Sequence, residues 1–144
     1  GQLAITCNKI GLHNESDLYI HKALLLAENL GNEESIAMVY NCAGILFKEW
    51  NKYNKAIPHF EKALKLQVNL EDTLMEAKIL NNLAGCFNES NPQKAEELLL
   101  RSINIKEHLE EGKSLAYSYA EMGNTFLVKS DYTTSINYFQ KAFF

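Results

Sequence analysis

The sequence predicts an all-α protein in which pairs of helices stack side by side as an α-solenoid. Two series of small side chains, each repeated about every forty residues, support this prediction. The first series is Ala4, Gly44, Ala84 and Gly123, and the second is Ser16, Ala56, Ala95 and Ser135. Repetition of this length is typical of solenoids, whose units contact only their neighbours.

Each unit is predicted to contain two amphipathic helices separated by a break. In the second unit the first helix carries Tyr40, Gly44 and Phe47, and the next helix carries Ala56 and Phe60, all at helical spacing. The glycine lets the second helix approach closely, and the aromatic side chain one turn later fills the space beyond it. The predicted helices cover residues 2–9, 15–29, 34–49, 53–69, 73–88, 92–109, 113–129 and 132–144.

The breaks between helices contain residues that favour helix ends. Asn91 is predicted to cap a helix whose first residue is Pro92, because proline has no N–H to leave unpaired there. Asp72 is a further candidate cap. Gly31 and Gly112 are predicted to end helices in the left-handed conformation that glycine adopts at little cost.

Composition argues against several classes of function. The formal net charge of −4 provides no basic surface for nucleic acid, and no apolar stretch approaches the roughly 18 residues of a membrane span. The three cysteines are expected to be small buried side chains. The four histidines are scattered, phosphate-binding glycine loops are absent, and no nucleophile lies beside a base. We therefore expect no enzymatic activity, cofactor or metal site.

The pattern resembles the tetratricopeptide repeat (TPR), with a repeat of about forty residues instead of the usual 34. The second unit matches most fully, through Tyr40, Ala43, Gly44, Phe47, Tyr53, Ala56, Phe60 and Ala63. The resemblance implies a right-handed superhelical α-solenoid. It divides the chain into an incomplete first repeat at 1–30, repeats at 31–70 and 71–110, and a truncated fourth repeat at 111–144.

In this family the first helices of successive repeats line a concave groove that receives peptides. The resemblance places the following residues in that groove: Asn41, Ile45, Lys48, Lys78, Asn81, Asn82, Tyr117, Glu121, Asn124 and Leu127. Asparagine offers donors and an acceptor, so a row of asparagines can pair with the main chain of an extended peptide. The alternative is that these are solvated polar positions on exposed helices.

The resemblance also argues against one family function. Repeats that hold the acidic tails of chaperones surround the terminal carboxylates with lysine, arginine and asparagine. At the matching positions only Asn82 fits, and Glu121 would repel a carboxylate.

Two functions remain. The first is a non-catalytic scaffold that binds a protein or peptide partner. The alternative is the sensory or regulatory part of a bacterial signalling protein, in which a bound peptide alters an attached effector. We expect a cytoplasmic fragment of a longer protein, whose open repeat ends could pair with a second copy.

Overall fold

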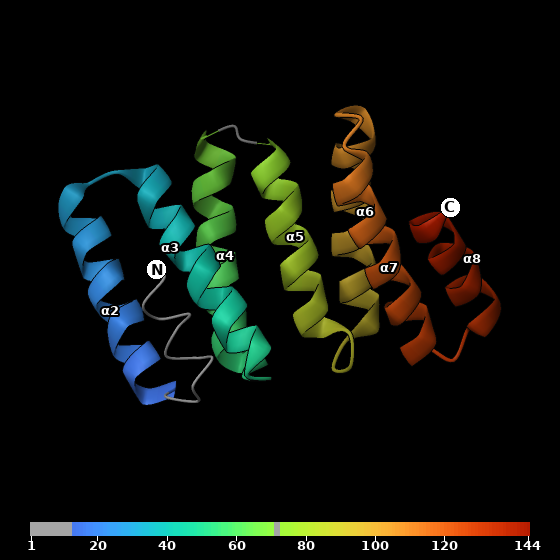
Figure 1. Cartoon of the computed structure of the whole chain (residues 1–144), viewed down its shortest axis with the longest axis horizontal. Helices are drawn as coiled ribbons and strands as arrows, with labels where there is room; N and C mark the ends of the chain where they lie inside the picture. The colour runs from blue at the N-terminus through green and yellow to red at the C-terminus, as the bar shows by residue number, and fades with distance from the viewer. Residues whose placement is uncertain (1–12, 71–72) are drawn as a thin grey trace. The chain divides into compact units, whose positions relative to one another are not determined.

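The computed structural model describes residues 13–70 and 73–144, and their regular secondary structure is entirely α-helical. The helices are α2 (His13–Leu30), α3 (Glu33–Glu49), α4 (Tyr53–Leu70), α5 (Thr73–Phe87), α6 (Pro92–His108), α7 (Gly112–Val128) and α8 (Tyr132–Phe143) (Figure 1). The predicted all-α class, built from successive helical hairpins, is confirmed. The helix predicted at 2–9 and the cap predicted at Asp72 lie outside the described residues.

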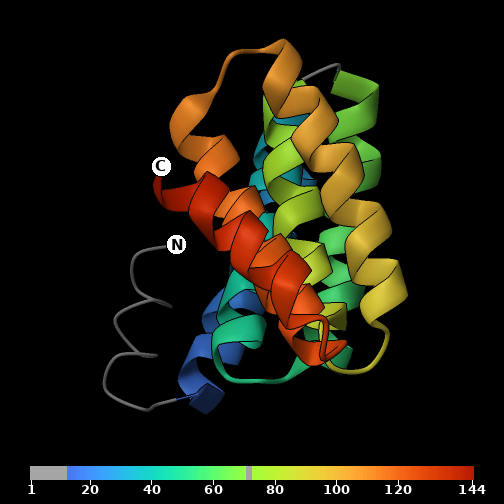
Figure 2. The ribbon, with the colours of Figure 1, turned by 90° about the vertical axis from the view of Figure 1, so that its right-hand side faces the viewer.

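The chain divides into two compact units, residues 1–71 and 72–144. In the first unit α2 packs on α3, and α3 on α4. In the second unit α5, α6, α7 and α8 pack in order, and α5 also contacts α7. Figures 1 and 2 show α7 and α8 as antiparallel helices joined by a short turn. The hairpins α3–α4, α5–α6 and α7–α8 fall inside the repeats proposed from the sequence, whose boundaries stay a prediction.

Glycine in the first helix of a hairpin provides room for an aromatic ring of the second. A Cβ atom added at Gly44 would lie 2.6 Å from a ring carbon of Phe60, and one at Gly123 would lie 2.7 Å from a ring carbon of Phe139. Both distances are far below van der Waals contact, so only glycine allows the rings to lie there. This explains why a small residue recurs at these positions.

Phe47, one turn after Gly44 on α3, is buried and packs with Trp50 at 5.6 Å and His59 at 5.2 Å between ring centroids. The ring beside the glycine is that of Phe60, which is fully buried and comes from α4.

Within residues 13–70 and 73–144, four helix ends adopt the left-handed backbone conformation. As predicted, Gly31 is one of them, with φ of 68°. The prediction for Gly112 is wrong, because Gly112 begins α7 and the left-handed residue of that turn is Glu110, with φ of 55°. The amide of Glu110 donates to Glu107 O at 3.2 Å, and that of Glu111 donates to Lys106 O at 3.1 Å. This bond pattern is the Schellman motif.

Asn51 in the α3–α4 turn and Ser130 in the α7–α8 turn adopt the same conformation, with φ of 58° and 62°. The amides that follow each of them donate five residues back, Lys52 to Phe47 O at 2.8 Å and Asp131 to Phe126 O at 3.0 Å. Three turns therefore share one geometry although only Asn51 is a residue that commonly tolerates it.

Side chains cap α3, α6 and α8, whereas Glu111 at the start of α7 makes no such bond. The predicted cap Asn91 is confirmed, since its Oδ1 accepts from the Lys94 amide at 3.2 Å and Pro92 starts α6. Asn32 caps α3 and Asp131 caps α8 in the same manner. Each cap satisfies an amide that has no partner within its helix.

Candidate functional site

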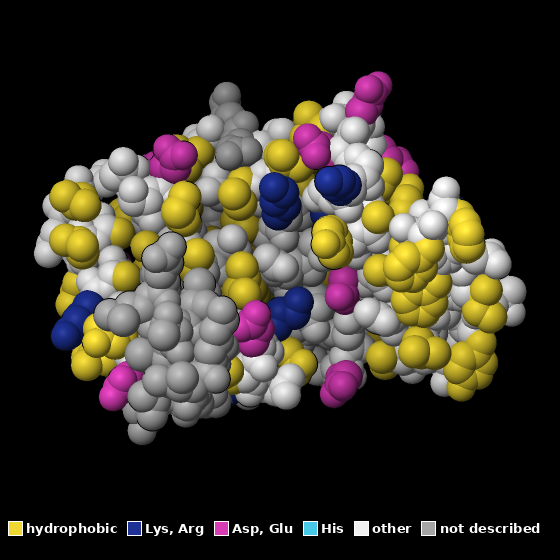
Figure 3. All heavy atoms as spheres, viewed as in Figure 1, with side chains coloured by type: hydrophobic (Ala, Val, Ile, Leu, Met, Phe, Trp, Pro, Cys, Tyr) yellow, Lys and Arg dark blue, Asp and Glu magenta, His cyan; other side chains and the backbone are white. Residues whose placement is uncertain are grey.

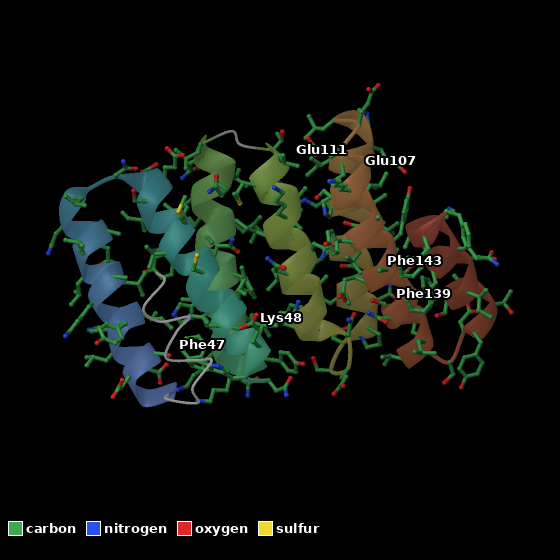
Figure 4. All side chains as sticks on the ribbon, viewed as in Figure 1. Phe47, Lys48, Glu107, Glu111, Phe139 and Phe143 are labelled. Atoms are coloured by element: carbon green, nitrogen blue, oxygen red, sulfur yellow. The ribbon has the colours of Figure 1, made fainter. Side chains whose placement is uncertain are left out.

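The predicted groove residues of the first unit lie on one side of α3. Asn41, Ile45 and Lys48 are each half-buried, and Met38 on the preceding turn is 56% exposed. Lys48 is labelled in Figure 4. The Oδ1 atom of Asn41 is buried and has no hydrogen-bond partner among the described residues. This amide is therefore not fixed by the part of the chain that the structure describes.

The second unit brings the other seven predicted residues onto two helices in contact, α5 and α7. Lys78 is exposed on α5, where Asn81 and Asn82 are half-buried. On α7, Tyr117 is 71% exposed and Leu127 is 50% exposed. Glu121 is half-buried and Asn124 is exposed on the same helix. The surface thus combines amide groups with apolar side chains, which we call the α5–α7 face.

Glu121 is held by a polar contact between the two helices. Asn88 Nδ2 donates to its Oε2 at 3.1 Å, and the buried hydroxyl of Thr125 donates to Asn88 Oδ1 at 2.7 Å. These bonds join the end of α5 to α7 and fix the orientation of both side chains. Glu121 therefore has a structural partner in addition to its predicted place in the groove.

A second polar cluster lies beneath the α5–α7 face. The hydroxyl of Ser118 on α7 donates to Asn81 Oδ1 on α5 at 2.7 Å. Lys106 on α6 donates to Ser118 Oγ at 2.7 Å and to Ser114 O at 3.0 Å. Ser102 on α6 donates to Ala77 O on α5 at 2.7 Å. Lys106, Ser102 and Ser118 are all buried, so the cluster ties together three helices from inside the unit.

Lys106 is the functional candidate that the sequence analysis missed. Only 1% of its surface is exposed, although lysine is rarely buried without a charged partner. Burial, and to a smaller extent repulsion from Lys78, lower its pKa to about 8. One signal was available, because Lys106 follows Ser102 by four residues just as Gln67 follows Ala63. Gln67 is also buried, so this position of the second helix faces inward in both hairpins.

An apolar recess of about 410 Å³ lies between α7 and α8. Its walls are Lys113, Ala116, Tyr117, Ala120, Ala142 and Phe143. Figure 3 shows hydrophobic side chains gathered over these two helices, and Figure 4 labels Phe143 on α8. Phe143 is 74% exposed, so its ring projects beside a floor of alanines.

Among the described residues, no group of three His, Cys, Asp or Glu side chains could hold a metal ion. The Nδ1 atoms of His59 and His108 lie 2.7 Å from carbonyls of their own helices, Lys55 O and Asn104 O. Among the helices that the structure describes, none has the length and apolar character needed to cross a bilayer.

Comparison with known proteins agrees with this architecture. Residues 52–108 match a family model described as tetratricopeptide repeat. The fold is also similar to the crystal structure of BtubC (BKLC) from P. vanneervenii, with a TM-score of 0.83 and 20% sequence identity. The match covers 97% of this chain and 59% of that chain, so this chain spans about three-fifths of that protein's length. At this identity the likeness shows the fold alone.

Proposed function

We propose that this chain, whose residues 52–108 match the tetratricopeptide repeat model, is a non-catalytic module that binds an extended segment of a partner protein on the first helices of its hairpins. Tetratricopeptide repeats generally mediate protein–protein interaction. The partner segment and its place on the molecule are the proposal.

The observation that carries the proposal is the mixture of groups on the α5–α7 face. Asn82 and Asn124 can donate to carbonyl groups and accept from amides of an extended chain. Tyr117 and Leu127 expose apolar surface on the same helix as Asn124. Exposed aromatic and aliphatic side chains next to amides provide both area and directional bonds for a peptide. In the first unit, α3 would bind the partner segment through Asn41, Ile45 and Lys48.

A random-peptide display selection on the intact chain tests this proposal. Peptides enriched on the parent chain are then titrated against the double variant Asn82→Ala and Asn124→Ala. Each lost hydrogen bond weakens binding by about fivefold to tenfold if it contributes about 1 kcal/mol. The matched control is Asn104→Ala with Asn137→Ala, which removes two exposed asparagines from the second helices α6 and α8. Equal affinities for both double variants would refute a binding site on α5 and α7.

Self-association is proposed for the recess between α7 and α8, which shares Tyr117 with the α5–α7 face. The patch contains both the projecting Phe143 ring and the alanine floor of Ala116 and Ala120, so two copies can each insert a ring into the other. Such a self-complementary patch forms a closed twofold dimer. Light scattering should show a dimer that Ala120→Glu converts to a monomer. A monomer at all accessible concentrations of the unmodified chain would refute it.

The sensory or regulatory role in a bacterial signalling protein rests on the family resemblance alone. It stays the alternative to the interaction module.

A further inference from the structure

We infer that the buried side chain of Lys106 is a positioning residue for the α5–α7 face, because it acts through Ser118 to fix the amide of Asn81 with its oxygen inward and its NH₂ group presented to a partner. Asn81 would then recognise only hydrogen-bond acceptors, such as a peptide carbonyl. The orientation of the Asn81 amide is inferred from the polar cluster. Its effect on peptide binding rests on the proposed function.

The direction of the hydrogen bonds begins at the ammonium group. A lysine ammonium has donors and no acceptor. Lys106 Nζ lies 2.7 Å from Ser118 Oγ, so Ser118 must accept from it. No carboxylate of the described residues forms a salt bridge with Lys106, whose other partner is the carbonyl of Ser114 at 3.0 Å.

The proton of Ser118 has one short acceptor. A hydroxyl carries a single proton, and Ser118 Oγ lies 2.7 Å from Asn81 Oδ1. Ser102 Oγ is more distant, at 3.4 Å, and its own proton is directed to Ala77 O at 2.7 Å. The Ser118 proton therefore goes to Asn81, and the three bonds run from Lys106 through Ser118 to the amide oxygen.

These bonds favour one orientation of the Asn81 amide. Turning it over would leave the Ser118 proton with Ser102 Oγ, at 3.4 Å, as its acceptor in place of Asn81 Oδ1 at 2.7 Å. Among the described residues nothing accepts a hydrogen bond from Asn81 Nδ2, and the side chain is half-buried. Its two N–H donors are thus available at the α5–α7 face.

The equivalent amide of the first unit lacks this arrangement. Asn41 precedes Gly44 by three residues, as Asn81 precedes Ala84, but its Oδ1 has no partner among the described residues. Gln67, the counterpart of Lys106, likewise has a buried Oε1 without a partner there. A fixed donor is therefore a property of the second unit.

Deprotonation of Lys106 would release the amide. A neutral amine can accept a hydrogen bond, so the Ser118 proton can turn from Asn81 toward Nζ. The pKa of about 8 brings this change close to neutral pH, and its causes are burial first and then repulsion from Lys78 of α5. From α7, Lys106 faces the Ser114 carbonyl and the Ser118 hydroxyl.

Carbon-detected NMR of the labelled chain tests the inference without any partner. The Asn81 Cγ shift should titrate between about pH 7 and 9 with the same midpoint as Lys106 Cε, and Lys106→Met should abolish that titration. The exposed Asn124 is the control and should not titrate in this range. If the Asn81 Cγ chemical shift changed neither with pH nor on Lys106→Met substitution, the inference would be wrong.

Binding is then measured with a peptide selected by display on the parent chain. Lys106→Met and Asn81→Ala should each weaken it by about fivefold to tenfold, the effect of one hydrogen bond. The double variant should lose no more than either single one, because both remove the same interaction. If the losses of binding free energy in the two single variants added up in the double variant, the inferred coupling between Lys106 and Asn81 would be wrong. If no peptide is selected, the proposed function fails. The NMR titration still tests whether Lys106 fixes the orientation of the Asn81 amide.

Discussion

Replacing Lys106 by methionine should leave the chain at least as stable at neutral pH and should remove a rise in stability that the parent shows in alkali. The ammonium group is buried without a carboxylate, and removing a charge from water is costly. Methionine has a similar length, no charge and a flexible side chain that fills such a space.

The magnitude follows from the pKa of Lys106 in the two states. In the folded chain it is about 8, and in the unfolded chain it takes the usual value of 10.5. Between these values the unfolded chain binds more protons, so the free energy of unfolding rises with pH. The full difference corresponds to about 3 kcal/mol, of which about 2 kcal/mol should appear between pH 7 and 9.5.

Two tyrosines set the upper limit of the useful range. Burial and a hydrogen bond to a carboxylate raise the pKa of Tyr40 beside Glu28 and of Tyr119 beside Glu107. The folded chain therefore holds these protons longer, and stability falls as the pH rises above about 10. Below that pH the two tyrosines contribute little to the pH dependence of stability. The difference in stability between parent and variant then isolates the contribution of Lys106.

The assay is urea unfolding followed by circular dichroism at a series of pH values. The parent should gain stability from pH 7 to 9.5, whereas Lys106→Met should stay flat. Lys94→Met, which removes an exposed lysine from the same helix, should behave like the parent. A parent whose stability is flat or falls over this range would refute the buried cation, and so would an equal rise in Lys106→Met.

Three other changes test the packing and the turns. Gly44→Leu should cost about 3 kcal/mol or more through overpacking, since even a Cβ there comes within 2.6 Å of Phe60; denaturation matching the parent would contradict the proposed register. Glu110→Gly should raise the free energy of unfolding by about 1 kcal/mol by relieving its left-handed backbone, and a loss would show that the strain is absent. Thr125→Val should cost about 1–3 kcal/mol, because Asn88 then keeps a half-buried oxygen without its donor; a neutral effect in the same unfolding assay would exclude that bond's contribution.

The parts of the fold that depend on contacts within a hairpin were predictable from the sequence. Gly44 and Gly123 recur because each faces a ring sixteen residues further along the chain, on the second helix of the same hairpin, so the repeated spacing reflects a repeated contact. The end of α6 was not predictable in the same way. The hydrogen bonds that close a turn decide which residue becomes left-handed, and they selected Glu110 although Gly112 stood two residues away.

The candidate site was predictable as a set of positions but not as a set of bonds. Helical spacing placed Asn81 and Asn82 on one helix and Asn124 on another. Nothing near Asn81 in the sequence indicates that its oxygen is used, because its donor is Ser118, 37 residues away. The burial of Lys106 has the same origin, since the groups that hold it come from the following helix. Contacts between distant helices decide which polar groups remain available.

The fit of ring against glycine has a consequence for how such chains evolve. Phe60 and Gly44 belong to one hairpin, and Phe139 and Gly123 to another, so each of these two hairpins contains both residues of its own contact. A gene segment that is copied in tandem therefore arrives already able to close, without compensating changes in its neighbour. Tandem duplication can therefore lengthen an array of this kind, and selection can then act on the residues of its outer surface.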